Sequence, residues 1–346
     1  LGDVYKRQSF IYMQRTFFAL FCAAAILIQP TLRAVITYGE NNEQAEVDYA
    51  SSENPALASV VAVSDASAVY LGNGWFLTAN HVAVNASTVI SQNGQSAKVS
   101  HVDNTLNSSF GADLKLFYVD DLDSFASLAS VNIATSAVYS SLSSTSFGYS
   151  RAGNLITGYT YNLTYSEGTY LTLAGAGYGR SASSALDAET VASDGIKGTV
   201  HSGESSLLAV QNSNGTKTLI TMAETKDGSA QAQNGDSGGG MFVQFENEWY
   251  IVGTITGVSP SISTSTAVFG SYGEASLTYG SNGIPNGVDT SALLENSLTM
   301  AASLEDYAET ISSIIATTPI PEPFETAILF CAAAFALAVV ARWRRK

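Results

Sequence analysis

The sequence predicts an all-β protein of the sandwich or barrel type that ends in one helix. Short runs rich in Val, Ile, Tyr and Thr alternate with turns of Gly, Asn and Ser, which is typical of half-buried strands. The clearest runs cover residues 59–63, 68–71, 97–102, 155–161, 170–173, 219–222 and 249–256. The predicted helix covers residues 303–315. Ser303 and Asp306 resemble a capping box, and apolar residues recur on one face of the helix: Leu304, Tyr307, Ile311, Ile314 and Ile315.

Three short motifs supply the residues of a nucleophilic triad. Residues 77–82 (LTANHV) contain His81, residues 113–116 (DLKL) begin with Asp113, and residues 235–239 (GDSGG) contain Ser237. A serine hydroxyl is a poor nucleophile at neutral pH, so it needs an imidazole to take its proton and a carboxylate to hold that imidazole. The glycine-rich turn would also leave the amides of Gly235 and Ser237 free to bind an oxyanion.

The order of the motifs along the chain separates the hydrolase classes. In α/β-hydrolases the histidine follows the serine, whereas all three histidines of this chain precede Ser237. The subtilisin order could be met by Asp48 or Asp65, but that class needs alternating strands and helices, which the pattern does not predict. The order histidine, aspartate, serine is the one that remains.

Asp113 is selected among several nearby carboxylates by its local context. It directly precedes the apolar run 114–117, which we expect to bury its carboxylate beside the imidazole. His101 and His201 lack comparable neighbours and are expected at the surface. The rival aspartates are Asp103, Asp120, Asp121 and Asp123.

Together these motifs resemble those of the trypsin-like serine proteases, which have the chymotrypsin fold. Residues 253–257 (GTITG) also resemble the strand that holds an extended substrate in that family, and the resemblance spans roughly residues 55–315. Asn80 departs from the commoner alanine. The resemblance implies two six-stranded antiparallel β-barrels with a C-terminal helix on the second. It also implies a serine endopeptidase in which His81 is the general base, Asp113 orients it and Ser237 is the nucleophile.

The same resemblance places the substrate-binding residues at Gln231, Thr256 and Gly257. Gln231 stands six residues before the nucleophile, where the family has the floor of its specificity pocket, and Thr256 would line that pocket. A preference for Arg or Lys requires a buried carboxylate there, so we expect no strong preference for basic residues. Asp236 and Glu224 are the remaining sources of negative charge nearby.

The N-terminal residues have the layout of a secretory signal peptide, preceded by residues 1–12 that we interpret as upstream sequence. Residues 13–34 contain a basic Arg15, an apolar run at 17–28 and a small residue at Ala34, after which cleavage is expected. An acidic leader, 35–54, would then precede the protease domain, 55–318. Cleavage would place residues 35 and 36 at a new N-terminus, and the resemblance implies the hypothesis that this N-terminus pairs with Asp236.

The C-terminal residues 319–346 contain Pro-Glu-Pro, an apolar segment at 326–341 and a basic end. The apolar segment would span about 24 Å as a helix, which is short for a permanent membrane span. The layout resembles the PEP-CTERM sorting signal of Gram-negative bacteria, and a plain single-span anchor is the alternative. We therefore expect export to the cell surface, outer envelope or matrix. The expected partners are a polypeptide substrate, the export machinery and an exosortase-type sorting enzyme, with membrane contact only through this segment.

Composition limits the other classes of function. Cys22 and Cys331 lie outside residues 35–318, so no disulfide, metal site or cofactor is expected there. The full chain has a net charge of −15. Residues 35–318 retain 7 basic and 27 acidic residues, a net charge of about −20, which disfavours nucleic-acid binding. The alternative function is a non-catalytic surface or matrix protein that keeps the trypsin fold for adhesion.

Overall fold

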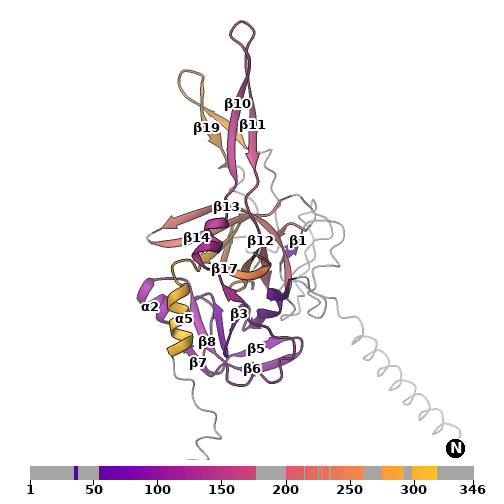
Figure 1. The fold of residues 1–346 in the computed structure, drawn as a ribbon, viewed down its shortest axis with the longest axis vertical. Helices are drawn as coiled ribbons and strands as arrows, with labels where there is room; N and C mark the ends of the chain where they lie inside the picture. The colour runs from indigo at the N-terminus through magenta and orange to yellow at the C-terminus, as the bar shows by residue number, and fades with distance from the viewer. Residues whose placement is uncertain are drawn as a thin grey trace, which may run out of the picture.

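The fold is mainly β, as predicted, and consists of two seven-stranded sheets that lie one above the other in Figure 1. The computed structural model describes residues 35–37, 54–176, 200–213, 215–224, 226, 228–233, 235–259, 275–291 and 298–317. The predicted upstream residues 1–12, signal peptide 13–34 and sorting signal 319–346, and most of the predicted leader, lie outside these residues. Within the described ranges, no helix has the length and apolar character needed to cross a membrane.

The first sheet curls without closing. Its strands are antiparallel and follow the order β6-β5-β2-β3-β4-β8-β7. A closed barrel was expected here, but in the described pairings β6 and β7 do not bond to each other. Strand β6 is largely exposed and β7 has three residues, so closure would bury little apolar surface. The strands are β2 (Val60–Val63), β3 (Ala66–Gly72), β4 (Trp75–Thr78), β5 (Val89–Gln92), β6 (Gln95–Lys98), β7 (His101–Asp103) and β8 (Lys115–Tyr118).

The second sheet closes into the predicted six-stranded antiparallel barrel. Its order is β16-β12-β13-β14-β20-β17, and β17 pairs back with β16. A seventh strand, β9 (Asn132–Ile133), joins β17 in parallel. The barrel strands are β12 (Tyr170–Gly175), β13 (His201–Ser213), β14 (Thr216–Met222), β16 (Gly240–Phe245), β17 (Glu248–Ser259) and β20 (Leu298–Ser303).

One apolar cluster spans both sheets, in addition to a separate cluster within each sheet. Leu77 and Leu116 of the first sheet belong to the same buried cluster as Phe242 and Ile251 of the second. Removal of these side chains from water stabilises the contact between the sheets. Two of the three sequence motifs begin or end in strands of the first sheet, β4 and β8, and the third lies on the loop that leads into β16 of the second sheet.

The C-terminal helix α5 (Ala308–Thr317) begins later than predicted. Ser303 still belongs to β20, and its hydroxyl accepts a hydrogen bond from the Glu305 amide at the start of the intervening turn. The helix was expected on the second barrel. It lies instead beside α2 (Thr105–Phe110) in Figure 1, where Phe110 packs against Tyr307 with ring centroids 5.9 Å apart.

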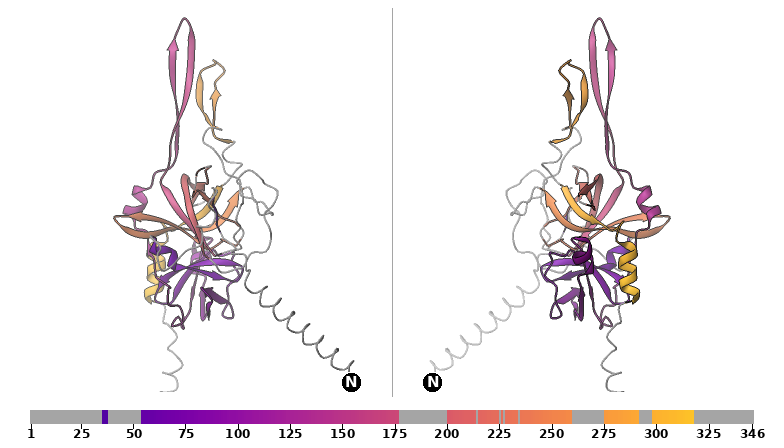
Figure 2. Two further views of the ribbon diagram at one scale, coloured as in Figure 1. Left: turned by 90° about the vertical axis from the view of Figure 1, so that its right-hand side faces the viewer. Right: turned by 90° about the vertical axis from the view of Figure 1, so that its left-hand side faces the viewer.

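Two hairpins project from the barrel, as both views of Figure 2 show: β10–β11 (Ser146–Asn154 and Gly158–Ser166) and β18–β19 (Ser276–Tyr279 and Pro285–Asp289). The run 155–161, predicted as one strand, contains the first turn, because Asn154 Oδ1 accepts hydrogen bonds from the amides of Ile156 and Thr157. The remaining elements are β1 (Ile36–Thr37), η2 (Pro55–Ser59), α3 (Ser136–Ser141) and β15 (Ala230–Gln231).

Candidate active site

His81 lies on a turn directly after β4. The turn is closed by a hydrogen bond from the Val82 amide to the Ala79 carbonyl, 3.1 Å long. His81 Nδ1 is 2.8 Å from Asp113 Oδ2, and the His81 backbone N–H donates to Asp113 Oδ1 at 3.0 Å. A carboxylate at Nδ1 favours the tautomer with the proton on that nitrogen. Nε2 is then left as a proton acceptor.

Strand pairing explains how Asp113 reaches this turn. Thr78, the last residue of β4, pairs with Lys115, the first residue of β8. Asp113, two positions earlier, therefore lies beside the turn that continues from β4. Its carboxylate was expected to be buried, but 39% of the side chain is exposed, although its sequence neighbours Ala112 and Leu114 are fully buried.

Ser237 lies on the loop that leads into β16. The backbone amides of three of the five motif residues donate hydrogen bonds to backbone carbonyls. Asp236 donates to Gln233 O at 3.0 Å, Gly238 to Ile255 O at 2.7 Å and Gly239 to Asp236 O at 2.8 Å. Over the described ranges, the amides of Gly235 and Ser237 donate no hydrogen bond. These are the two groups that were predicted to bind an oxyanion.

Ser67 of β3 joins the Ser237 loop to the first sheet. Its amide donates to Ser237 O at 2.9 Å, and its hydroxyl donates to Gly235 O at 3.0 Å. The Thr78 hydroxyl in turn donates to Ser67 O at 2.7 Å. Since Thr78 precedes His81 by three residues, these bonds hold the serine loop against the strand that leads to the histidine. Sequence reasoning missed Ser67, which stands among small residues of a strand and carries no motif.

The three motifs therefore meet at the junction of the two sheets. No hydrogen bond between the His81 imidazole and the Ser237 hydroxyl occurs among the described residues. In unliganded hydrolases this bond is often long and shortens when substrate binds.

The chain matches no protein-family model, and it matches no curated protein. The assignment of the site therefore rests on its geometry and on the motifs.

The three predicted substrate-binding residues lie on two strands. Gln231 is 2% exposed, and its strand β15 pairs with β1 through Ile36. Thr256 and Gly257 lie at a bulge of β17, half-buried, and Thr256 Oγ1 donates to Met300 O at 3.4 Å. The preceding Ile255 exchanges backbone hydrogen bonds with the Ser237 loop. Thr256 is thus next to a residue that is hydrogen-bonded to the Ser237 loop, and Gln231 is buried.

The two acidic residues named as sources of negative charge are both buried. Asp236 is fully buried, and its Oδ2 accepts a hydrogen bond from the Gln233 amide at 2.7 Å. Glu224 is 7% exposed and accepts from the Tyr170 hydroxyl at 3.3 and 3.4 Å. Burial and the hydrogen bonds and charges of Glu167 and Glu224 raise the pKa of Tyr170 above its ordinary value.

The other histidines differ in their surroundings. His101 is exposed, as expected, whereas His201 was expected at the surface and is fully buried at the start of β13. The residues that follow it in β13 are Ser202, Gly203 and Glu204, so the local sequence gave no signal for its burial. No cluster of three or more His, Cys, Asp or Glu side chains able to hold a metal ion occurs in the part of the chain that the structure describes.

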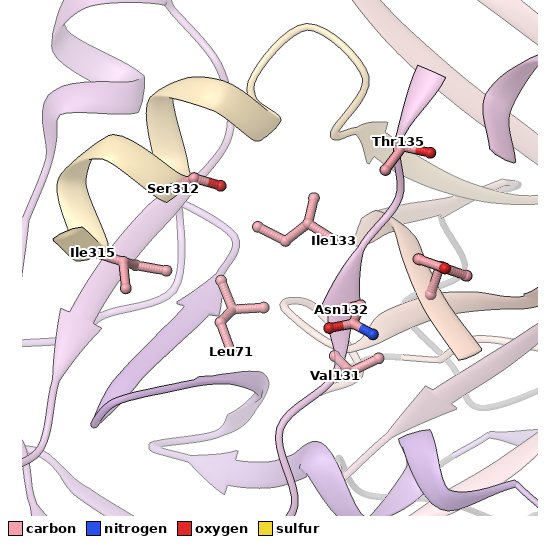
Figure 3. A pocket seen from close by; sticks show the side chains of 8 residues that line it. Leu71, Val131, Asn132, Ile133, Thr135, Ser312 and Ile315 are labelled. Carbon is pink, nitrogen blue, oxygen red and sulfur yellow. The ribbon is translucent and has the colours of Figure 1, made fainter. Parts of the chain in front are cut away.

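A cavity of about 430 Å³ lies away from the triad, between β3, β9, β17 and α5 (Figure 3). Its walls are apolar or uncharged and include none of the predicted site residues, so it is not the candidate active site. The lining residues are Leu71, Val131, Asn132, Ile133, Thr135, Tyr250, Ser312 and Ile315.

Proposed function

We propose that this protein is an exported serine endopeptidase that cleaves peptide bonds through an acyl-enzyme. The observation that carries the proposal is the double contact of Asp113 with the ring and the amide of His81. A closed six-stranded barrel beside a half-barrel is compatible with the trypsin-like fold, and a chymotrypsin-type double barrel is the finer form of the proposal.

Each triad residue has a defined role in the proposed reaction, and His81 acts in turn as base and as acid. Ser237 Oγ attacks the scissile carbonyl carbon while His81 Nε2 takes the hydroxyl proton, and Asp113 stabilises the imidazolium that forms. The amides of Gly235 and Ser237 bind the oxyanion. The imidazolium then gives its proton to the leaving amine. A water molecule, deprotonated by His81, then attacks the acyl carbon. The bond to Ser237 Oγ breaks, the imidazolium returns its proton to Oγ, and the acid is released.

The proposed specificity follows from the uncharged Gln231. We expect no strong preference for Arg or Lys at the scissile position, because the buried carboxylates Asp236 and Glu224 are engaged by other groups. A cleavage profile dominated by Lys and Arg would contradict this part of the proposal.

The ends of the chain complete the proposal. A signal peptide at 13–34 would direct export, and the sorting signal at 319–346 would attach the enzyme to the envelope or release it to the matrix through an exosortase-type enzyme. Cleavage after Ala34 would create an N-terminus at Val35. Val35 is 1% exposed, and the next residue, Ile36, pairs with Gln231. These contacts support the hypothesis that the new ammonium group reaches Asp236.

Covalent labelling with a fluorophosphonate tests the proposal without knowledge of the substrate. We expect one adduct on Ser237, located by mass spectrometry, and its loss in a His81→Ala variant. A folded protein that does not react would contradict the proposal and favour the non-catalytic surface or matrix role.

A further inference from the structure

Lys115 is a buried cation in a strand whose residues are all buried. It begins β8, and only 9% of it is exposed. Lysine is rarely buried without a partner, because the removal of its ammonium group from water is unfavourable. Lys115 therefore requires hydrogen-bond acceptors inside the protein.

The acceptors are the two carbonyl groups that flank His81. Lys115 Nζ donates to Asn80 O and to Val82 O, both at 2.7 Å. These carbonyls belong to the turn that presents the histidine, and 48% of the His81 side chain remains exposed. The ammonium group thus binds the turn from its buried side and leaves the imidazole accessible.

Asp113 and Lys115 hold the same turn in complementary ways. Asp113 binds the ring and the amide of His81, while Lys115 binds the carbonyls of the residues on either side. Burial lowers the pKa of Lys115 below its ordinary value, and the nearby Asp113 carboxylate opposes that effect. The DLKL motif therefore carries two groups of opposite charge that act on one turn.

We propose that Lys115 is a positioning residue for the reaction assigned to His81 and Ser237, because it fixes the turn that carries the general base. This inference rests on the proposed function. Displacement of a catalytic group by about 1 Å can reduce a rate by about a hundredfold. The role is distinct from those of the triad, since the ammonium group of Lys115 donates its hydrogen bonds to the backbone beside His81.

Three variants of the full chain test the role. Lys115→Met removes the ammonium group and keeps an unbranched stem, whereas Lys115→Arg keeps donors for both carbonyls. Lys217→Met is the matched control, because Lys217 also binds two oxygen partners, on Glu305 and Asp306, but lies on β14 of the other sheet. The fluorophosphonate labelling rate of Ser237 and the hydrogen-exchange rate of the His81 amide are measured for each variant.

We expect Lys115→Met to lower the labelling rate by about tenfold to a hundredfold and to raise exchange of the His81 amide by about tenfold. Lys115→Arg should recover most of both values. Lys217→Met should leave both within about twofold of wild type. A folded Lys115→Met protein with wild-type labelling and wild-type His81 exchange overturns the proposal.

The two measurements separate this inference from the proposed function. If the wild-type protein does not react with the probe, the endopeptidase function fails, while His81 exchange still shows whether Lys115 fixes the turn. Where Lys115→Met does not fold, Lys115→Gln replaces it, since its amide is uncharged and its side chain is one atom shorter than that of lysine. Unchanged His81 exchange in that variant would equally overturn the proposal.

Discussion

The Ser67 amide donates a hydrogen bond of 2.9 Å to the carbonyl of Ser237, and so joins the first sheet to the candidate nucleophile. The Ser67 hydroxyl adds bonds to Gly235 O at 3.0 Å and from the Ala176 amide at 2.8 Å. Ser67→Ala would leave the buried Ala176 amide and the half-buried Gly235 carbonyl without this partner. We expect a loss of about 1–3 kcal/mol in unfolding free energy, measured by urea denaturation, together with slower labelling of Ser237.

Ser150→Ala is the control for this prediction, because Ser150 is exposed on the projecting strand β10. It should change the unfolding free energy by less than about 0.5 kcal/mol. Equal stability of the two variants would mean that the Ser67 hydroxyl does not support the loop.

Gly238 has a backbone conformation and surroundings that exclude a side chain. Its φ is +87°, and a Cβ there would collide with Ser67 O and Thr78 Oγ1. Gly238→Ala should therefore cost more than the roughly 1 kcal/mol that positive φ alone imposes on alanine, and should abolish labelling of Ser237. Unfolding free energies of the variant and wild type measure the effect.

Gly215→Ala isolates the conformational part of that cost. Gly215 has a similar φ of +83°, but no atom lies within 4 Å of the position that a Cβ would take. The difference between the two variants then reports the collision at Gly238. If the two variants lose the same unfolding free energy, Ser67 moves away from the added Cβ of residue 238 at no measurable cost.

The sequence predicted the parts of the fold that depend on local pattern. The apolar runs of β12, β14 and β17 predict these strands from the local sequence alone, without knowledge of the strands with which they pair. Closure of the first sheet could not be predicted in this way, because it depends on pairing between β6 and β7. The start of α5 was also misplaced, since β20 continues through the apparent cap, Ser303.

The same distinction applies to the candidate site. His81, Asp113 and Ser237 stand in recognisable motifs, so the sequence indicated them together. Ser67 and Lys115 act on backbone groups, and the bond from Ser67 to Gly235 joins positions 168 residues apart. A motif search cannot detect such contacts, although a lysine within the apolar run of β8 was a signal that a buried partner exists.

Tyr139 links α3 to β17. We expect it to make the free energy of unfolding depend on pH in the alkaline range. Its hydroxyl donates to Val252 O at 2.6 Å, and burial raises its pKa above the ordinary value of about 10. Above that pH the unfolded chain loses this proton while the folded protein keeps it, so unfolding becomes more favourable. Tyr139→Phe should lose about 1 kcal/mol of unfolding free energy at pH 8, and its deficit relative to wild type should shrink above pH 10. Urea denaturation at several pH values measures this.

Tyr279→Phe provides the reference, because Tyr279 is 56% exposed on the second hairpin. Its difference from wild type should stay near zero at every pH. A deficit of Tyr139→Phe that stays constant from pH 8 to pH 11 would contradict the assignment of the alkaline effect to this buried hydroxyl.

The buried position of Val35 allows a test of whether the candidate site requires a free N-terminus at this residue. Val35 packs in the buried cluster that contains Ala230 and Ala232, close in sequence to the fully buried Asp236. If the ammonium group of a chain that begins at Val35 pairs with Asp236, extra residues ahead of Val35 remove that charge. We expect such an extended protein to react with the fluorophosphonate about tenfold more slowly or not at all.

A second variant distinguishes loss of the charge from crowding by the added residues. Asp236→Asn in the chain that begins at Val35 keeps the shape of the side chain but removes its negative charge, and it should slow labelling to a similar extent. Combination with the extension should then add little further loss, because both changes remove the same interaction. Full reactivity of the extended protein would show that the candidate site forms without a free N-terminus at Val35.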